Sequence, residues 1–182
     1  MKISLMHRID TQGYHFKLQE GCIPESGLFL LLLHADKTPP HIGMIKDGIF
    51  HAIGMQGPER LERQVLLKTI RQKKIVTLAF MIVDSVNYLS YTTPEDALEQ
   101  LQHEPFTTCL ALPLACMQGI AGPETSNCRT VFDLLDILFE KNMIQGIFSE
   151  GIEHQSTFCL KQYSLKDVEA RINELSLKTS TR

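Results

Sequence analysis

The sequence lacks any apolar run of about eighteen residues or more, so we expect no transmembrane helix. Its densest apolar run, Leu28–Leu33, is too short to span a bilayer and is typical of a buried strand. The N-terminal segment, which begins MKISLMHRID, also lacks the long apolar stretch of a signal peptide. These absences predict a protein of the cytoplasm.

No CxxC pair occurs among the cysteines, and their number is odd. Both features argue against a disulfide framework and against a zinc ribbon. In the reducing cytoplasm we expect free thiols at all five positions, which are Cys22, Cys109, Cys116, Cys128 and Cys159.

The chain has no excess of basic residues, because its formal net charge is −3. Nucleic acid usually requires a basic face, so we expect no nucleic-acid partner. Gly/Ser-rich linkers and internal repeats are also missing, and 182 residues match the usual size of one domain. We therefore predict a single domain over residues 1–182. The sequence leaves its oligomeric state open.

Short apolar segments dominate the first half of the chain, and helix-forming segments become frequent later, so we predict an α+β fold. The predicted strands cover residues 2–6, 14–18, 28–34, 41–45, 49–53, 75–83, 87–91 and 107–112. The predicted helices cover residues 59–73, 93–103, 126–142 and 165–177. The last helix is expected to pack against the outside of the sheet.

Local signals support several of these boundaries. Asp47-Gly48 lies between two short apolar segments and predicts a β-hairpin. Thr93 and Pro94 form a typical helix start, as does Ser164 with an acidic residue three positions later. Ser126-Asn127 can cap the amphipathic run that follows.

Cys128 follows that cap directly and is the candidate nucleophile. In the first turn of a helix, unpaired N–H groups and the helix dipole favour a thiolate, which is the reactive form of cysteine. The same N–H groups could bind an oxyanion formed during acyl transfer. The alternative is that Cys128 is a small buried core residue, as most free cysteines are.

His41 and His51 are the candidate partners of Cys128. They lie in the two strands of the predicted hairpin, so we expect their imidazoles to share one face of the sheet. One could act as a base toward the thiol while the other orients it. Alternatively, both are polar residues at strand ends, or they form a metal site together with His34.

Two segments resemble the circularly permuted branch of the NlpC/P60 superfamily, which includes lecithin:retinol acyltransferase-like and YiiX-like proteins. The segment from Pro40 to Ala52 resembles the hairpin that carries the catalytic histidine, and the segment from Ser126 to Phe132 resembles the helix start that carries the cysteine. The histidine precedes the cysteine, as in the permuted branch. The resemblance implies a permuted papain-like core, with an antiparallel sheet packed against the Cys128 helix.

By this resemblance Cys128 is the nucleophile, His41 the general base and His51 the orienting residue. The implied activity is a cysteine-dependent hydrolase or acyltransferase that cleaves an amide or ester bond through a thioester, without a cofactor or metal. Its substrate would be a peptide, a lipid or another small molecule. Two alternatives stay open, namely a non-catalytic binding module of the same fold and a histidine-based metal hydrolase.

Overall fold

The computed structural model describes residues 6–10, 15–17, 23, 26–83, 92–101, 108–151 and 157–179. The predicted strand over residues 87–91 and most of the one over 2–6 lie outside these ranges. Within them, no helix has the length and apolar character needed to cross a membrane.

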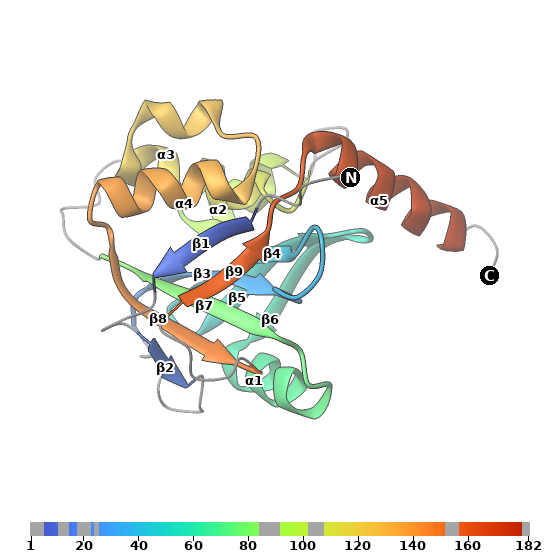
Figure 1. The fold of residues 1–182 in the computed structure, drawn as a ribbon, viewed down its shortest axis with the longest axis horizontal. Helices are drawn as coiled ribbons and strands as arrows, with labels where there is room; N and C mark the ends of the chain where they lie inside the picture. The colour runs from blue at the N-terminus through green and yellow to red at the C-terminus, as the bar shows by residue number, and fades with distance from the viewer. Residues whose placement is uncertain are drawn as a thin grey trace.

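A seven-stranded sheet forms the centre of the fold (Figure 1). Its spatial order is β2 (His15–Lys17), β8 (Ile144–Glu150), β7 (Thr77–Ile82), β3 (Leu28–Leu33), β4 (His41–Lys46), β5 (Ile49–Gly54) and β6 (Gly57–Glu62). Strand β2 is parallel to β8, and all other neighbours are antiparallel. A separate two-stranded antiparallel sheet pairs β1 (Met6–Asp10) with β9 (Thr157–Lys161). The predicted strands over 14–18, 28–34, 41–45, 49–53 and 75–83 are confirmed.

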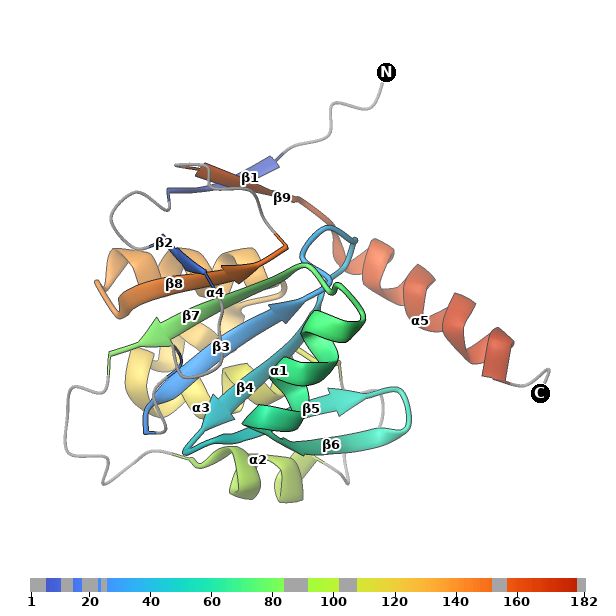
Figure 2. The ribbon, with the colours of Figure 1, turned by 90° about the horizontal axis from the view of Figure 1, so that it is seen from below.

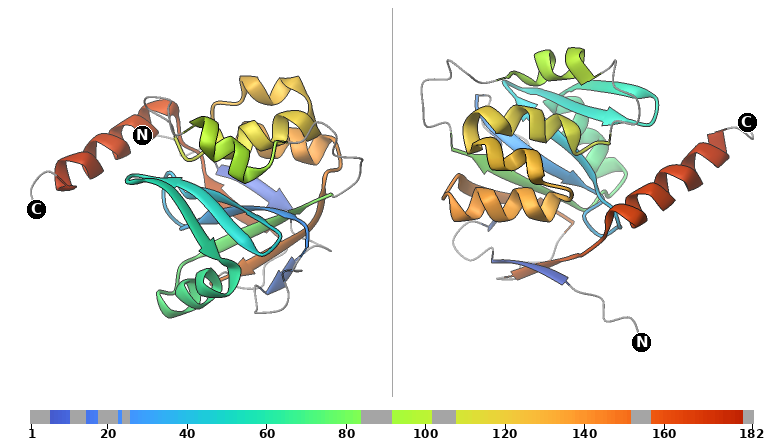
Figure 3. Two further views of the ribbon diagram at one scale, coloured as in Figure 1. Left: turned by 180° about the vertical axis from the view of Figure 1, so that it is seen from behind. Right: turned by 90° about the horizontal axis from the view of Figure 1, so that it is seen from above.

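Helices cover both faces of the large sheet, so the class is α+β. They are α1 (Arg63–Gln72), α2 (Pro94–Leu101), α3 (Ala111–Ala121), α4 (Val131–Glu140) and α5 (Leu165–Thr179), with a 3-10 turn η1 (Pro123–Asn127) before α4. Figure 2 shows α1 on one face, and Figure 3 shows α2, α3 and α4 on the other.

Strand β3 is apolar at every position because both of its faces are covered. Leu30 and Leu32 pack into the core cluster that contains residues of α2, α3 and α4, whereas Phe29 and Leu31 pack into the cluster that contains residues of α1. Because side chains alternate between the faces of a strand, a strand covered on both faces buries all of its residues. Every residue of β3 is indeed buried.

The predicted β4–β5 hairpin is confirmed. Asp47 and Gly48 form its turn with φ angles of 48° and 79°, the left-handed values of a type I′ turn. The resulting register places Met44 opposite His51. It therefore decides on which face of the sheet each histidine side chain lies.

The predicted helix over residues 59–73 is wrong in its first part. Residues Gly57–Glu62 form β6, which pairs with β5, and α1 begins only at Arg63. Pairing with β5 satisfies the backbone of these residues, and tertiary context thereby overrides their helix propensity.

The predicted strand over residues 107–112 is also wrong. Thr108 is followed by a turn, and α3 begins at Ala111. Pro113 is compatible with this helix, since a proline in the first turn costs no hydrogen bond within the helix. This correction changes the surroundings of Cys109, the first residue of the turn.

The helix predicted over residues 126–142 starts later than expected. Thr130 is its cap, and a capping box joins the Thr130 and Asp133 side chains to each other's backbone N–H groups. Ser126 and Asn127 belong to η1 instead. Cys128 consequently lies two residues before the cap and outside the first turn of α4.

Helix α5 is confirmed, with Ser164 donating its N–H to Asp167 at 2.7 Å. Its predicted packing against the sheet is wrong. Figures 1 and 3 show α5 extending away from the rest of the molecule. Leu165 and Ile172 are each 42% exposed, as expected for a projecting helix.

Candidate active site

His41 lies at the first position of β4, directly after Pro40. Its Nε2 atom is 3.7 Å from Oε2 of Glu59. This distance is an ion-pair contact and is too long for a hydrogen bond. The Cys109 thiol also raises the pKa of the imidazole, and His41 Nε2 itself makes no hydrogen bond with the described residues.

Glu59 reaches His41 because the neighbouring strand has no side chain in its way. Glu59 lies on β6 opposite Ala52, and its carboxylate extends over Gly54 near the end of β5. A Cβ atom at Gly54 would clash with the Glu59 carboxylate oxygen. The glycine therefore leaves the space through which the carboxylate approaches His41.

Cys109 is a half-buried free thiol in the turn immediately before α3. Helix α3 packs against β4. Cys109 thus has both features that we expected of Cys128, namely a position at the start of a helix and a neighbouring imidazole. The place of Cys109 before a helix was not predicted, because residues 107–112 were expected to form a strand.

The charges of this cluster favour a protonated imidazole. Burial lowers the pKa of His41, but the Cys109 thiol and the Glu59 carboxylate outweigh burial and raise the pKa to about 9. His41 in turn lowers the pKa of Glu59, against the opposing effect of burial. At neutral pH a protonated His41 therefore lies beside the Glu59 carboxylate.

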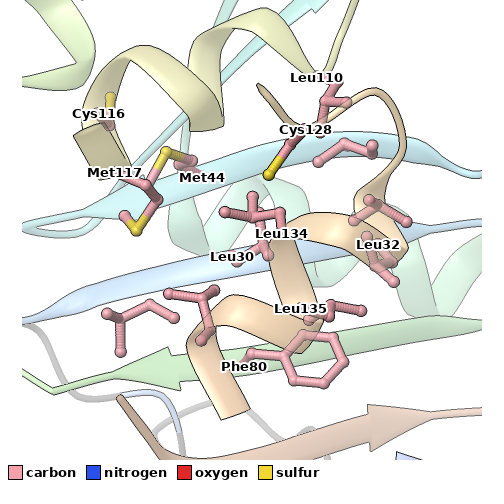
Figure 4. Close-up of a cluster of buried hydrophobic side chains, with 14 of the residues drawn as sticks. Leu30, Leu32, Met44, Phe80, Leu110, Cys116, Met117, Cys128, Leu134 and Leu135 are labelled. Carbon is pink, nitrogen blue, oxygen red and sulfur yellow. The ribbon is translucent and has the colours of Figure 1, made fainter. Parts of the chain in front are cut away.

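Cys128 is a core residue in this structure. It is 8% exposed, and Figure 4 shows its side chain within an apolar cluster with Leu30, Leu32 and Leu134. Burial raises the pKa of Cys128, and the negative charge of Asp133 raises it further. We expected a lowered pKa for Cys128, and this prediction is wrong. Cys128 lies before the helix, and no histidine is among the groups that shift its pKa.

His51 has its own partners, away from His41. It is fully buried on β5, opposite Met44, and its Nε2 atom is 3.2 Å from Oε1 of Glu95 on α2. Neither ring nitrogen makes a hydrogen bond within the described part of the chain. Burial is the main reason that the pKa of His51 is lowered.

The register also separates the two imidazoles. His51 belongs to the face of Met44, whereas His41 is three residues from Met44 and alternates to the set that contains Gly43 and Ile45. The predicted sharing of one face is therefore wrong. His51 contacts Glu95 in this structure, and the acidic group beside the His41 ring is Glu59.

His34 lies beside this cluster without joining a metal site. Burial and the positive charge of Lys37 lower the pKa of His34, and His41 contributes to the same effect. Within the ranges that the structure describes, no group of three histidine, cysteine, aspartate or glutamate side chains could hold a metal ion. The site with His34, His41 and His51 that we considered from the sequence does not form there.

The expected free thiols are confirmed at the three cysteines whose side chains the structure describes, Cys109, Cys116 and Cys128. A signal for Cys109 was present in the sequence, because Ala, Leu and Met are frequent in the residues after it and all three favour a helix. Glu59 had no comparable signal, because its role depends on the pairing of β5 with β6.

Comparisons of the chain with protein-family models, with curated proteins and with solved structures found no match.

Proposed function

We propose that this protein is a cysteine-dependent hydrolase or acyltransferase that acts on an amide or ester bond, with Cys109 as its nucleophile. The observation behind the proposal is the 3.7 Å contact between His41 and Glu59, together with the effect of the Cys109 thiol on the pKa of His41. A nucleophile, a base and an orienting group in this order are the components that thiol catalysis requires.

The proposed reaction begins with a proton held by His41 and a thiolate on Cys109. The sulfur attacks the substrate carbonyl carbon, and the carbonyl electrons move onto oxygen to form an oxyanion. In the first turn of α3 the Ala111 N–H donates to Thr108 and Pro113 has no N–H, so the Leu112 N–H is the group that we propose to stabilise that charge. When the tetrahedral intermediate collapses, the C–N or C–O bond breaks, His41 protonates the leaving group, and a thioester remains.

The second half of the proposed reaction regenerates the thiol. His41, now neutral, removes a proton from water or from another acceptor, whose oxygen or nitrogen attacks the thioester carbon. The C–S bond breaks and the acyl group leaves on the acceptor. The proton taken from the acceptor stays on His41 and the sulfur leaves as a thiolate, which restores the starting pair, and Glu59 keeps the imidazole oriented throughout. No cofactor takes part in this scheme.

The proposed fold family is the permuted papain-like core of the NlpC/P60 superfamily. Two features support it. A catalytic histidine opens a strand of an antiparallel hairpin, and a cysteine at the start of a helix follows it later in the chain. The cysteine in this role is now Cys109 instead of Cys128. A peptide, a lipid and a small amide all remain possible substrates within this proposal.

The test is alkylation of the folded protein by iodoacetamide at about pH 6, read by peptide mass spectrometry. At this pH an ordinary thiol is mostly protonated and reacts slowly. We expect Cys109 to react first and Cys128 to be protected by burial. His41→Ala should slow the alkylation of Cys109 by about tenfold. The matched control, His34→Ala, should leave the rate nearly unchanged.

Two results would contradict the proposal. If Cys109 reacts no faster than Cys128, or if its rate does not depend on His41, the cluster is not a nucleophilic site. The chain would then be a binding module. If Cys128 reacts first and depends on His41, the assignment made from the sequence is restored.

A further inference from the structure

Strand β6 forms an open edge of the large sheet. It lies at one end of the strand order, beside β5, and within the described ranges no strand pairs with its other side. Figure 2 shows β6 beyond β5 at this end of the sheet. Five of its six residues are exposed, and the strand at the opposite end, β2, has only three residues. A long open edge of this kind is suited to pair with a further strand.

The backbone groups of Arg60 and Glu62 point outward from this edge. Along an antiparallel strand, the N–H and C=O groups of successive residues point alternately to one neighbour and to the other. The two-residue β4–β5 turn is closed by a hydrogen-bonded pair, and the register that follows directs the backbone of Leu61 toward β5. Arg60 and Glu62 therefore each offer an N–H and a C=O to a further strand. Pro58 belongs to the same outward set, where its missing N–H costs the sheet no hydrogen bond.

The side chains of β6 divide between the two faces of the sheet. Leu61 is 39% exposed and lies opposite Phe50, which packs with residues of α1, so Leu61 lies on the α1 face. Arg60 and Glu62 alternate to the other face, and both are exposed. The Arg60 side chain is 65% exposed and is 3.9 Å from Glu95, so most of it is open to a further contact.

The order of charges along β6 favours one way of pairing two copies. When identical strands pair antiparallel, a two-fold axis passes through one position, and the residue there faces its own copy. Glu59, Arg60 or Glu62 at this position would face a like charge, which is destabilising. Pro58 would leave the central pair without an N–H donor. Within residues 58–62, Leu61 is the position that avoids both penalties.

We propose that β6 is the interface of a homodimer, in which two copies of the strand pair antiparallel about Leu61 and join their sheets. In this register Arg60 lies opposite Glu62 of the second copy, and their outward backbone groups form hydrogen bonds with each other. Their side chains are opposite charges on one face, and the two Leu61 side chains meet on the other. This interface would form whether or not Cys109 is a nucleophile.

Two charge reversals test the register. Sedimentation velocity measures self-association of the wild-type protein, Arg60→Glu and Glu62→Arg over a range of concentrations. We expect the wild-type protein to dimerise and each variant to associate about tenfold more weakly or less, because like charges then face each other. Arg60→Glu has negative charges at both positions and Glu62→Arg has positive charges at both, so a mixture of the two should dimerise again. Lys161→Glu, in the separate small sheet, is the control and should dimerise like the wild type.

The position of the two-fold axis is tested by Leu61→Cys. Side chains that face each other in a pair without backbone hydrogen bonds are close enough for a disulfide. Diamide oxidises the two thiols to one disulfide and takes up the two protons and two electrons. We expect a covalent dimer linked through position 61, identified by mass spectrometry of unreduced peptides. Met55→Cys is the control, because Met55 is 51% exposed in the β5–β6 turn and lies away from the axis.

Each other result overturns the inference. A wild-type protein that is monomeric at every concentration would leave this edge to a strand of another protein. Wild-type dimers that persist in both charge reversals would form through another surface. If the reversals unfold at the wild-type temperature and are still monomeric when mixed, or if Leu61→Cys is not linked at position 61, the pairing about Leu61 is wrong.

Discussion

Replacing Glu59 by glutamine tests the charge pairing on which the candidate site depends. The Nε2 and Oε2 atoms of His41 and Glu59 are 3.7 Å apart. At this distance two unit charges attract by about 1 kcal/mol in bulk water and by about 4 kcal/mol at an effective dielectric constant of about 20. Because the Glu59 side chain is 46% exposed, the lower value applies. One pKa unit corresponds to about 1.4 kcal/mol, so Glu59→Gln should lower the pKa of His41 by about one unit.

The measurement is the pH titration of the His41 ring by NMR, assigned with a His41→Gln variant. In the wild-type protein the midpoint should lie near 9. In Glu59→Gln it should fall by about one unit, and in the control Glu62→Gln, which removes a charge from the same strand, it should stay in place. A wild-type midpoint near 6.5, or equal shifts in both variants, would refute the reasoning.

The same pairing has a consequence for stability, with a definite sign. The pKa of His41 is raised from 6.5 to about 9 in the folded protein, so the folded state binds the proton more tightly than the unfolded state does. The resulting stabilisation is complete below pH 6.5 and is lost as the pH rises toward about 9. Urea unfolding across this range should show the loss, and Glu59→Gln should make it smaller and complete at a lower pH.

Three further predictions concern the surroundings of the site. Gly43→Ala should lower the free energy of unfolding by about 1–3 kcal/mol in urea titrations, because its Cβ would collide with the Phe50 ring; a neutral effect would contradict the packing. Gly54→Ala should displace only the flexible end of Glu59 and lower the pKa of His41 without a comparable loss of stability. Because burial lowers the pKa of His51 from 6.5, the contribution of His51 to thermal stability should be constant above pH 6.5 and should decrease as the pH falls below it. Replacing His51 with leucine should reduce this acid-side loss, and an unchanged pH profile would show that His51 is not its cause.

Local features were predictable from the sequence wherever a few neighbouring residues decide the conformation. Asp47-Gly48 predicted the hairpin because glycine and aspartate tolerate the left-handed φ values of its turn. The Thr93 cap was confirmed by the 3.1 Å bond that its hydroxyl group accepts from the Asp96 N–H. Leu28–Leu33 predicted a buried strand because its residues are apolar on both faces.

Other features depended on distant parts of the chain. The segment after Gly57 forms a strand because β5 offers it an edge to pair with, although its residues suit a helix as well. A short apolar run such as the one around Cys109 is compatible with both a strand and a helix. The choice between them decides whether Cys109 or Cys128 lies at the start of a helix.

By itself, the sequence determined the α+β class, the hairpin that begins with His41, and the chemistry expected of a cysteine with a histidine. Only the tertiary structure brought Glu59 to His41 and placed Cys109, instead of Cys128, directly before a helix. Glu59 reaches His41 because β4, β5 and β6 pair in one register, and α3, the helix that follows Cys109, packs against β4. Register and packing involve residues far apart in the chain, and spacing along the sequence does not encode them.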